Sequence, residues 1–180
     1  MKSKILSLIL CSRNDSYMGN SRWRLETTLN LTLLNLADAG FLEKVEILIC
    51  DWGSQEPLSK VLSLVPEAVG NVRFLNIPKE IALKEQKDSK FPEVLALNSV
   101  ARKANGEFIG RIDNDTVIGK EFFDYFFDLI NDSSKLFYDI DNTFLFVERR
   151  SIPYRFTSQS FPLDYVKLFI LFFGQSLKIE

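Results

Sequence analysis

Two aspartates separated by one residue, Asp113 and Asp115, are the clearest candidates for chemistry in the sequence. They stand in "RIDNDTV", at the end of the apolar segment "EFIGRI". In an extended segment, residues i and i+2 point to the same side, so the two carboxylates are expected to face one way. The chain contains no histidine, which excludes Ser-His-Asp catalysis and histidine-ligated zinc or iron. Two adjacent carboxylates then favour Mn²⁺ or Mg²⁺, and a solvated acidic turn before the next helix is the alternative.

Two further polar clusters follow apolar segments. "SRND" at 12–15 follows the apolar run 5–11, and "DWGS" at 51–54 follows the run 45–50, where the chain is expected to turn. In an open parallel sheet, ligands bind outside the carboxyl ends of the strands. If the three apolar segments are parallel strands, the three polar clusters share one edge of the sheet and form a binding crevice.

The elements that position these clusters alternate between strands and helices. Continuous apolar runs predict buried strands, and apolar residues three or four apart predict helices. The predicted strands are 5–11, 45–50, 71–77 and 107–112, and the predicted helices are 22–37, 57–65, 91–104 and 119–131. Asn105 and Gly106 are expected to end the third helix, with glycine at its usual C-terminal position. The alternation predicts an α/β fold, with a mostly parallel Rossmann-like sheet and helices on both faces.

Length and composition indicate one soluble globular domain. The chain has 180 residues, of which 46% are hydrophobic and 26% charged, and its formal net charge is −2. The missing basic excess argues against a nucleic-acid partner. The apolar N-terminal run is interpreted as a buried strand rather than a signal peptide, and the run at 165–174 is too short for a transmembrane segment. A cytoplasmic protein, or one peripheral to a membrane, is therefore expected.

Cysteine and phenylalanine give further indications. Cys11 and Cys50 match no metal-binding spacing, so we interpret them as buried thiols in a reducing compartment. The chain has 16 phenylalanines, several of them in "FFDYFF" at 122–127 and "LFILFF" at 168–173. Such segments indicate either a well-filled core or a surface for a homo-oligomer or another partner.

The three polar clusters and their strands together resemble a known family. "LSLILCSRND", "VEILICDWGS" and "LNSVARKANGEFIGRIDNDT" occur in this order and resemble the nucleotide-sugar half of GT-A-fold glycosyltransferases, especially family 2. The resemblance implies transfer of a sugar from a nucleotide-sugar donor, a UDP-sugar first of all, to a glycan, lipid or protein acceptor. It also implies one GT-A-like domain, with residues 1–118 as the nucleotide-sugar-binding half and 119–180 as an incomplete acceptor-side half.

The resemblance also assigns roles to single residues. The residues matched to the nucleoside-binding part are Ser12, Arg13, Asn14, Asp51, Gly53 and Ser54. The first three match the loop around the nucleoside, and Asp51 matches the acid that hydrogen-bonds the base. Asn98 and Ala101 match a helix near the ribose and diphosphate. Asp113 and Asp115 match the DxD motif, whose carboxylates bind the ribose and a Mn²⁺ or Mg²⁺ ion. That metal stabilises the charge on the departing UDP.

The acceptor side leaves alternatives open. Inverting family members need a carboxylate base there, for which Glu148 and Asp164 are the candidates. A non-catalytic or truncated module that binds nucleotide sugars is the first alternative. The segment "LFYDIDNTFLF" also resembles the first motif of haloacid-dehalogenase phosphatases, with Asp139 as nucleophile and Asp141 as general acid. The short remainder of the chain argues against that class, and a turn between strands at 135–138 and 143–148 is the preferred interpretation.

Overall fold

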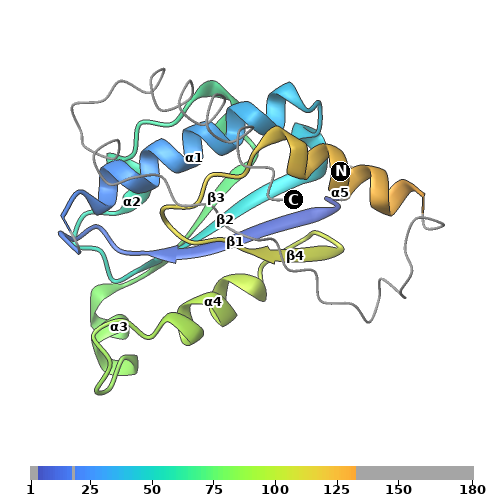
Figure 1. Ribbon diagram of the computed structural model, residues 1–180. Coiled ribbons are helices and arrows are strands. Elements are labelled where there is room, and N and C mark those ends of the chain that lie inside the picture. The colour runs from blue at the N-terminus through green and yellow to red at the C-terminus, as the bar shows by residue number, and fades with distance from the viewer. Residues whose placement is uncertain (1–3, 18, 133–180) are drawn as a thin grey trace, which may run out of the picture. The chain divides into compact units, whose positions relative to one another are not determined.

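The computed structural model describes residues 4–17 and 19–132 (Figure 1). The chain forms two compact units, Met1–Gly119 and Lys120–Glu180. In the second unit, the described residues form one helix, α5 (Lys120–Asn131), as predicted. The three polar clusters all belong to the first unit.

The first unit is built on a four-stranded sheet in the order β3-β2-β1-β4. The strands are β1 (Leu6–Ser12), β2 (Val45–Trp52), β3 (Val72–Ile77) and β4 (Phe108–Arg111). Each strand runs parallel to its neighbours. The predicted α/β fold with a Rossmann-like sheet is therefore confirmed, and the described sheet is entirely parallel.

Helices cover both faces of this sheet. α1 (Ser21–Asp38) lies on one face, and α3 (Lys79–Glu85) and α4 (Glu93–Ala101) lie on the opposite face (Figure 1). The remaining connections contain α2 (Leu58–Val61) and two short 3₁₀ turns, η1 (Leu42–Lys44) and η2 (Pro66–Ala68). In the part of the chain that the structure describes, no helix is both long and apolar enough to cross a membrane.

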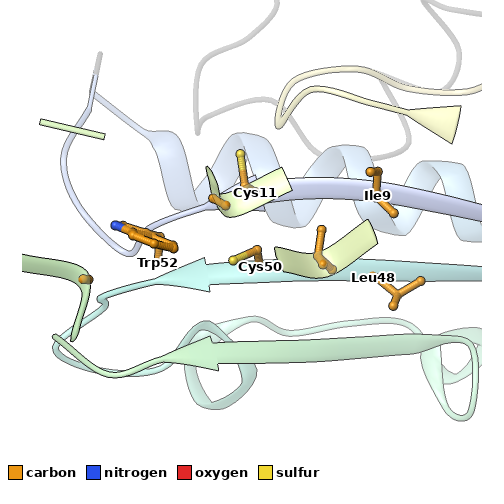
Figure 2. Close-up of a cluster of buried hydrophobic side chains, with 8 residues drawn as sticks. Ile9, Cys11, Leu48, Cys50 and Trp52 are labelled. Carbon is orange, nitrogen blue, oxygen red and sulfur yellow. The ribbon is translucent and has the colours of Figure 1, made fainter. Parts of the chain in front are cut away.

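The two central strands are buried along their whole length, because helices cover both of their faces. Every residue of β1 and β2 is buried, whereas the edge strands β3 and β4 are half-buried or exposed. The buried cluster under α3 and α4 consists of Ile9, Cys11, Leu48, Cys50, Trp52, Ala82, Ala96 and Val100 (Figure 2). Burying one large aliphatic side chain stabilises a fold by about 1.5–3 kcal/mol, so this cluster holds both helices on the sheet.

Cys11 and Cys50 lie side by side in this cluster. They are register partners in the paired strands β1 and β2, and both are free thiols. Burial raises the pKa of each thiol to about 12. The prediction that both cysteines are buried is confirmed.

Three helices differ from the predicted pattern. α2 ends at Val61 instead of residue 65, because Leu62 is already extended. The helix predicted at 91–104 is shorter, Glu93–Ala101. The sequence pattern does not predict α3 at all, because Ala82 is the one buried residue of this seven-residue helix and no apolar periodicity arises.

Gly106 does not end a helix, contrary to the prediction from "NG". Its backbone N–H donates to the Ser7 hydroxyl across 2.8 Å. A Cβ atom on Gly106 would lie 2.6 Å from the backbone nitrogen of Ser7. Glycine is therefore needed here because the chain passes against β1 on its way into β4.

Glu46 anchors the same passage at the amino end of β2. Its side chain is 3% exposed, and it accepts hydrogen bonds from Ser7 Oγ (2.7 Å) and from the backbone N–H of Asn105 (2.6 Å). Arg73 Nη2 lies 2.9 Å from its other oxygen. Burial acts to raise the pKa of Glu46, but the hydrogen bonds from Ser7 and Asn105 and the charge of Arg73 outweigh it, so the pKa is lowered.

Candidate functional site

The carboxyl ends of β1, β2 and β4 meet at one edge of the sheet, called the carboxyl edge below. Ser12 at the end of β1 is the register partner of Asp51 at the end of β2. Asn114, between the two aspartates that follow β4, donates from Nδ2 to Ser12 Oγ across 3.1 Å. The three polar clusters therefore do share an edge, as the parallel order requires.

Asp51 is a buried residue of β2 and not part of the following turn, which corrects the predicted strand end. Its side chain is 2% exposed. Its carboxylate accepts hydrogen bonds from the Ser54 hydroxyl and from the backbone N–H of Leu58, the latter at 2.7 Å. Burial raises the pKa of Asp51, although the hydrogen bonds from Ser54 and Leu58 act in the opposite direction. Asp51 thus fixes the loop between β2 and α2.

The turn itself begins at Gly53. Its φ of +74° lies in the left-handed region, which favours glycine, and a Cβ there would lie 2.6 Å from Cβ of Ala82 in α3. Ser54 follows, and its hydroxyl accepts a hydrogen bond from the backbone N–H of Asn14 across 2.8 Å. Asn14 Nδ2 donates to the carbonyl of Glu56 across 3.1 Å. These contacts join the loop after β1 to the loop after β2.

Arg13 connects the loop after β1 with the segment that precedes α4. Its Nε lies 2.8 Å from an Asp15 oxygen, and its Nη1 donates to the carbonyl of Lys90 across 3.1 Å. The guanidinium carbon also lies 5.6 Å from the centre of the Phe91 ring, a cation–π distance. The Arg13 side chain is 29% exposed, so the group is partly open to solvent at the carboxyl edge.

Asp113 and Asp115 stand in a turn and not in an extended segment, which corrects the prediction about their direction. The N–H of Thr116 donates to the carbonyl of Asp113 across 3.1 Å, so the rule for residues i and i+2 of a strand does not apply. Asp113 Oδ1 lies 3.2 Å from Arg111 Nη2, and Asp115 Oδ2 lies 3.8 Å from Arg24 Nη1. The two carboxylates are 30% and 58% exposed. Each therefore has an arginine partner and contact with solvent.

A row of polar residues on α1 holds this turn. The Thr28 hydroxyl donates to the carbonyl of Asn114 across 2.8 Å, and Thr32 Oγ1 accepts from the N–H of Ile118 at 3.1 Å. Asn35 Nδ2 donates to the carbonyl of Ile118 across 2.9 Å. Sequence reasoning did not identify Thr28, Thr32 and Asn35, which we call the polar row of α1. Their spacing of four and three residues on a leucine-rich helix is the signal that could have revealed them.

Asn98 and Ala101 lie away from the carboxyl edge. α4 begins beside Arg13 and ends toward Asn105, which contacts Glu46 at the amino end of β2. Between Glu93 and Ala101 the helix rises about 12 Å. Asn98 is exposed, and Ala101 packs against the buried cluster. The structure therefore does not bring these two residues to the polar clusters of the carboxyl edge.

The remaining candidates lie outside the described residues. These are Glu148 and Asp164, proposed as bases, and Asp139 and Asp141 of the phosphatase-like segment. Within residues 4–17 and 19–132, no group of three or more His, Cys, Asp or Glu side chains could hold a metal ion. Asp113 and Asp115 supply two carboxylates to this edge.

Trp52 is a buried polar side chain next to the edge. It is 2% exposed, and its indole nitrogen has no hydrogen-bond partner among the described residues. Figure 2 shows this nitrogen at the end of the ring that points away from Cys50. A buried donor without an acceptor costs about 1–3 kcal/mol. Asn114 Oδ1, in the turn after β4, is likewise buried without a hydrogen-bond partner among the described residues.

The edge thus gathers Arg13, Arg24 and Arg111 with the carboxylates of Asp15, Asp113 and Asp115. Guanidinium groups bind phosphates in a bidentate manner, and carboxylates bind hard cations. Comparison of the chain with protein-family models and with curated proteins returns no match. The functional interpretation therefore depends on the residues of this edge.

Proposed function

We propose that the protein is a metal-dependent glycosyltransferase of the GT-A type, resembling family 2, which binds a nucleotide sugar at the carboxyl edge. The observation that supports this most is the hydrogen bond from Asn114 to Ser12, because it joins the DxD turn to the end of β1 beside Asp51. A phosphate-rich donor needs both cationic groups and oxygen ligands for a metal, and this edge contains both. A UDP-sugar is the first donor to test.

The nucleoside would lie against the loops after β1 and β2. Arg13 and Asn14 are partly exposed there, and Asn14 is joined to Ser54. Asp51 is buried with its carboxylate bonded to Ser54 and Leu58, so we propose that it acts on the nucleoside by positioning this loop. Substitution of Asp51 is then expected to weaken nucleoside binding together with the stability of the loop.

Asp113 and Asp115 fit a divalent cation. Both supply hard oxygen ligands and both reach solvent, so diphosphate and water oxygens can complete the shell that Mn²⁺ or Mg²⁺ prefers. When bound, the cation would neutralise charge on the departing nucleoside diphosphate. The residues of the chain would orient the diphosphate, and the polar row of α1 would keep the turn in place.

Two thiols without a disulfide fit a reducing compartment, so we propose a cytoplasmic location, free or peripheral to a membrane. The candidates for the acceptor-side base, Glu148 and Asp164, stay a prediction, because both lie outside the described residues. If the protein binds nucleotide sugars and never releases free nucleotide from them, it is a nucleotide-sugar-binding module instead of a transferase.

The test is calorimetric titration of UDP and GDP, with and without Mn²⁺, followed by assays of nucleotide release from UDP- and GDP-sugars. Asp113→Asn and Asp115→Asn are each expected to weaken Mn²⁺-dependent binding about tenfold or more, because each removes a charged ligand. Asp38→Asn is the matched control, since Asp38 is exposed at the end of α1. Equal nucleotide affinity in wild type and both site variants, with or without metal, would exclude the assigned site.

A further inference from the structure

Each aspartate of the DxD turn has an arginine as its counter-ion. Arg111 Nη2 lies 3.2 Å from Asp113 and also 2.6 Å from Glu93 Oε1. Arg24 Nη1 lies 3.8 Å from Asp115, and its other terminal nitrogen donates to the carbonyl of Tyr17 across 3.1 Å. The carboxylates expected to bind a cation therefore already have cationic groups beside them.

These ion pairs are weak enough to exchange partners. The Arg111 and Asp113 side chains are 54% and 30% exposed, and those of Arg24 and Asp115 are 22% and 58% exposed. Ion pairs with this much solvent contact contribute little to stability. A divalent cation on the carboxylates would displace the guanidinium groups, and a diphosphate brought by that cation would offer them new oxygens at a short distance.

Both arginines are placed to reach such an anion. Arg111 ends β4 and Arg24 stands in the first turn of α1, so they approach the DxD turn from two different elements. The N-terminal turn of a helix also favours negative charge. Arginine binds phosphate oxygens through two parallel N–H bonds, which a lysine cannot do.

We propose that Arg24 and Arg111 are diphosphate-binding residues, which the metal-binding carboxylates hold as counter-ions until metal and nucleotide arrive together. This inference rests on the proposed function. It adds which side chains bind the diphosphate, and that they leave the carboxylates when metal and nucleotide bind together. Binding of metal alone must break an ion pair without any gain for the arginine. Binding of metal with nucleoside diphosphate gives both aspartates and both arginines a new partner, so the two ligands favour each other's binding.

The test is Arg111→Gln, measured with Mn²⁺ alone and with UDP in the presence of Mn²⁺. Without its counter-ion, Asp113 is expected to bind Mn²⁺ alone about two- to fivefold more tightly, the size of an exposed ion pair. UDP with Mn²⁺ is expected to bind about tenfold more weakly, because a charged hydrogen-bond donor is lost. A purely structural role of Arg111 would move both affinities in the same direction. For Arg24→Gln we expect the same two changes at Asp115, namely tighter binding of Mn²⁺ alone and weaker binding of UDP with Mn²⁺.

Two further variants complete the experiment. Arg111→Lys keeps the charge, so its affinity for Mn²⁺ alone should stay at the wild-type value while UDP affinity falls only in part. The control variant is Arg102→Gln, because Arg102 is an exposed arginine just after α4. It should change neither the affinity for Mn²⁺ alone nor that for UDP with Mn²⁺. Unchanged or weaker Mn²⁺ binding by Arg111→Gln overturns this proposal, even where the wild type binds UDP with Mn²⁺. A wild type without metal-dependent nucleotide binding overturns the proposed function and this inference together.

Discussion

The substitution Glu46→Gln tests the physical account of the buried carboxylate at the amino end of β2. It keeps the size and shape of the side chain and replaces one carboxylate oxygen by an NH₂ group. Gln can still accept from Ser7 and from the Asn105 backbone with its carbonyl. The NH₂ group then faces Asn105 Nδ2 and Arg73, which both donate to Oε2 in the wild type, at 3.2 and 2.9 Å. Two donors would lose their acceptor.

The expected loss follows from these contacts. A hydrogen bond to a charged group contributes about 1.5–3 kcal/mol, but Arg73 is 46% exposed, so its part is at most about 1 kcal/mol. The Asn105 Nδ2 bond is long, and the neutral Gln avoids the cost of burying a charge. We therefore expect Glu46→Gln to lower the free energy of unfolding by about 2 kcal/mol at pH 7.

The pH dependence makes this prediction specific. The folded pKa of Glu46 is lowered, so its stabilising effect is complete above the unfolded pKa of about 4.3 and is lost as the pH falls through the folded pKa. The difference between wild type and Glu46→Gln should therefore shrink as the pH is lowered from about 5 toward 3.

Urea unfolding at several pH values, followed by circular dichroism, measures this difference. Glu107→Gln is the control, because Glu107 is exposed in the same passage and the same change should cost less than about 0.5 kcal/mol. A difference for Glu46→Gln that stays constant from pH 7 to acid would refute the reasoning, since the charge of Glu46 would then have no part in it.

The other predictions concern the opposite end of β2, the close approach at β1 and the thiols. Burial raises the folded pKa of Asp51, so its contribution is fully present below the unfolded pKa of about 3.9 and is lost as the pH rises through the folded pKa. In urea unfolding, Asp51→Asn should therefore cost more stability at acid pH than at neutral pH, the reverse of Glu46→Gln. Gly106→Ala should lower the free energy of unfolding by about 2 kcal/mol or more, because its Cβ would meet the backbone of Ser7; a loss under about 0.5 kcal/mol would contradict the close approach. Cys11 and Cys50, both with a pKa of about 12, should not react with Ellman's reagent at pH 8 until urea unfolds the protein, and rapid reaction in the native state would disprove their burial.

Local pattern was sufficient to find the four strands, but not to predict their order in the sheet. β1 and β2 are continuous apolar runs because both of their faces are covered, and each run predicts a strand by itself. The shared edge of the three polar clusters then followed from parallel order alone. The strands could be predicted because their buried residues form a pattern in the sequence. α3 buries one residue, Ala82, so it leaves no repeating pattern from which a helix could be predicted.

The exact geometry of the site depends on contacts between distant residues. Thr28 and Asn114 are 86 residues apart, and Asn35 and Ile118 are 83 apart. Nothing near Asp113 in the sequence predicts that α1 will hold its turn or that Arg24 will pair with Asp115, whereas Arg111 is only two residues from its partner Asp113. Likewise, "NG" fits a helix end by local rules, and only the neighbouring β1 shows why Gly106 is needed.

The central place of β1 in the sheet has a consequence for synthesis of the chain. β1 pairs with β2, which begins at Val45, and also with β4, which begins at Phe108. A nascent chain that has been made as far as Ile77 can pair three strands, but β1 then presents its second edge to solvent. Unpaired apolar edges are sites of aggregation and chaperone binding. The four residues of β4 therefore cover this edge of β1 late, and a chain released before them would expose "LSLILCS" as an open template for other strands.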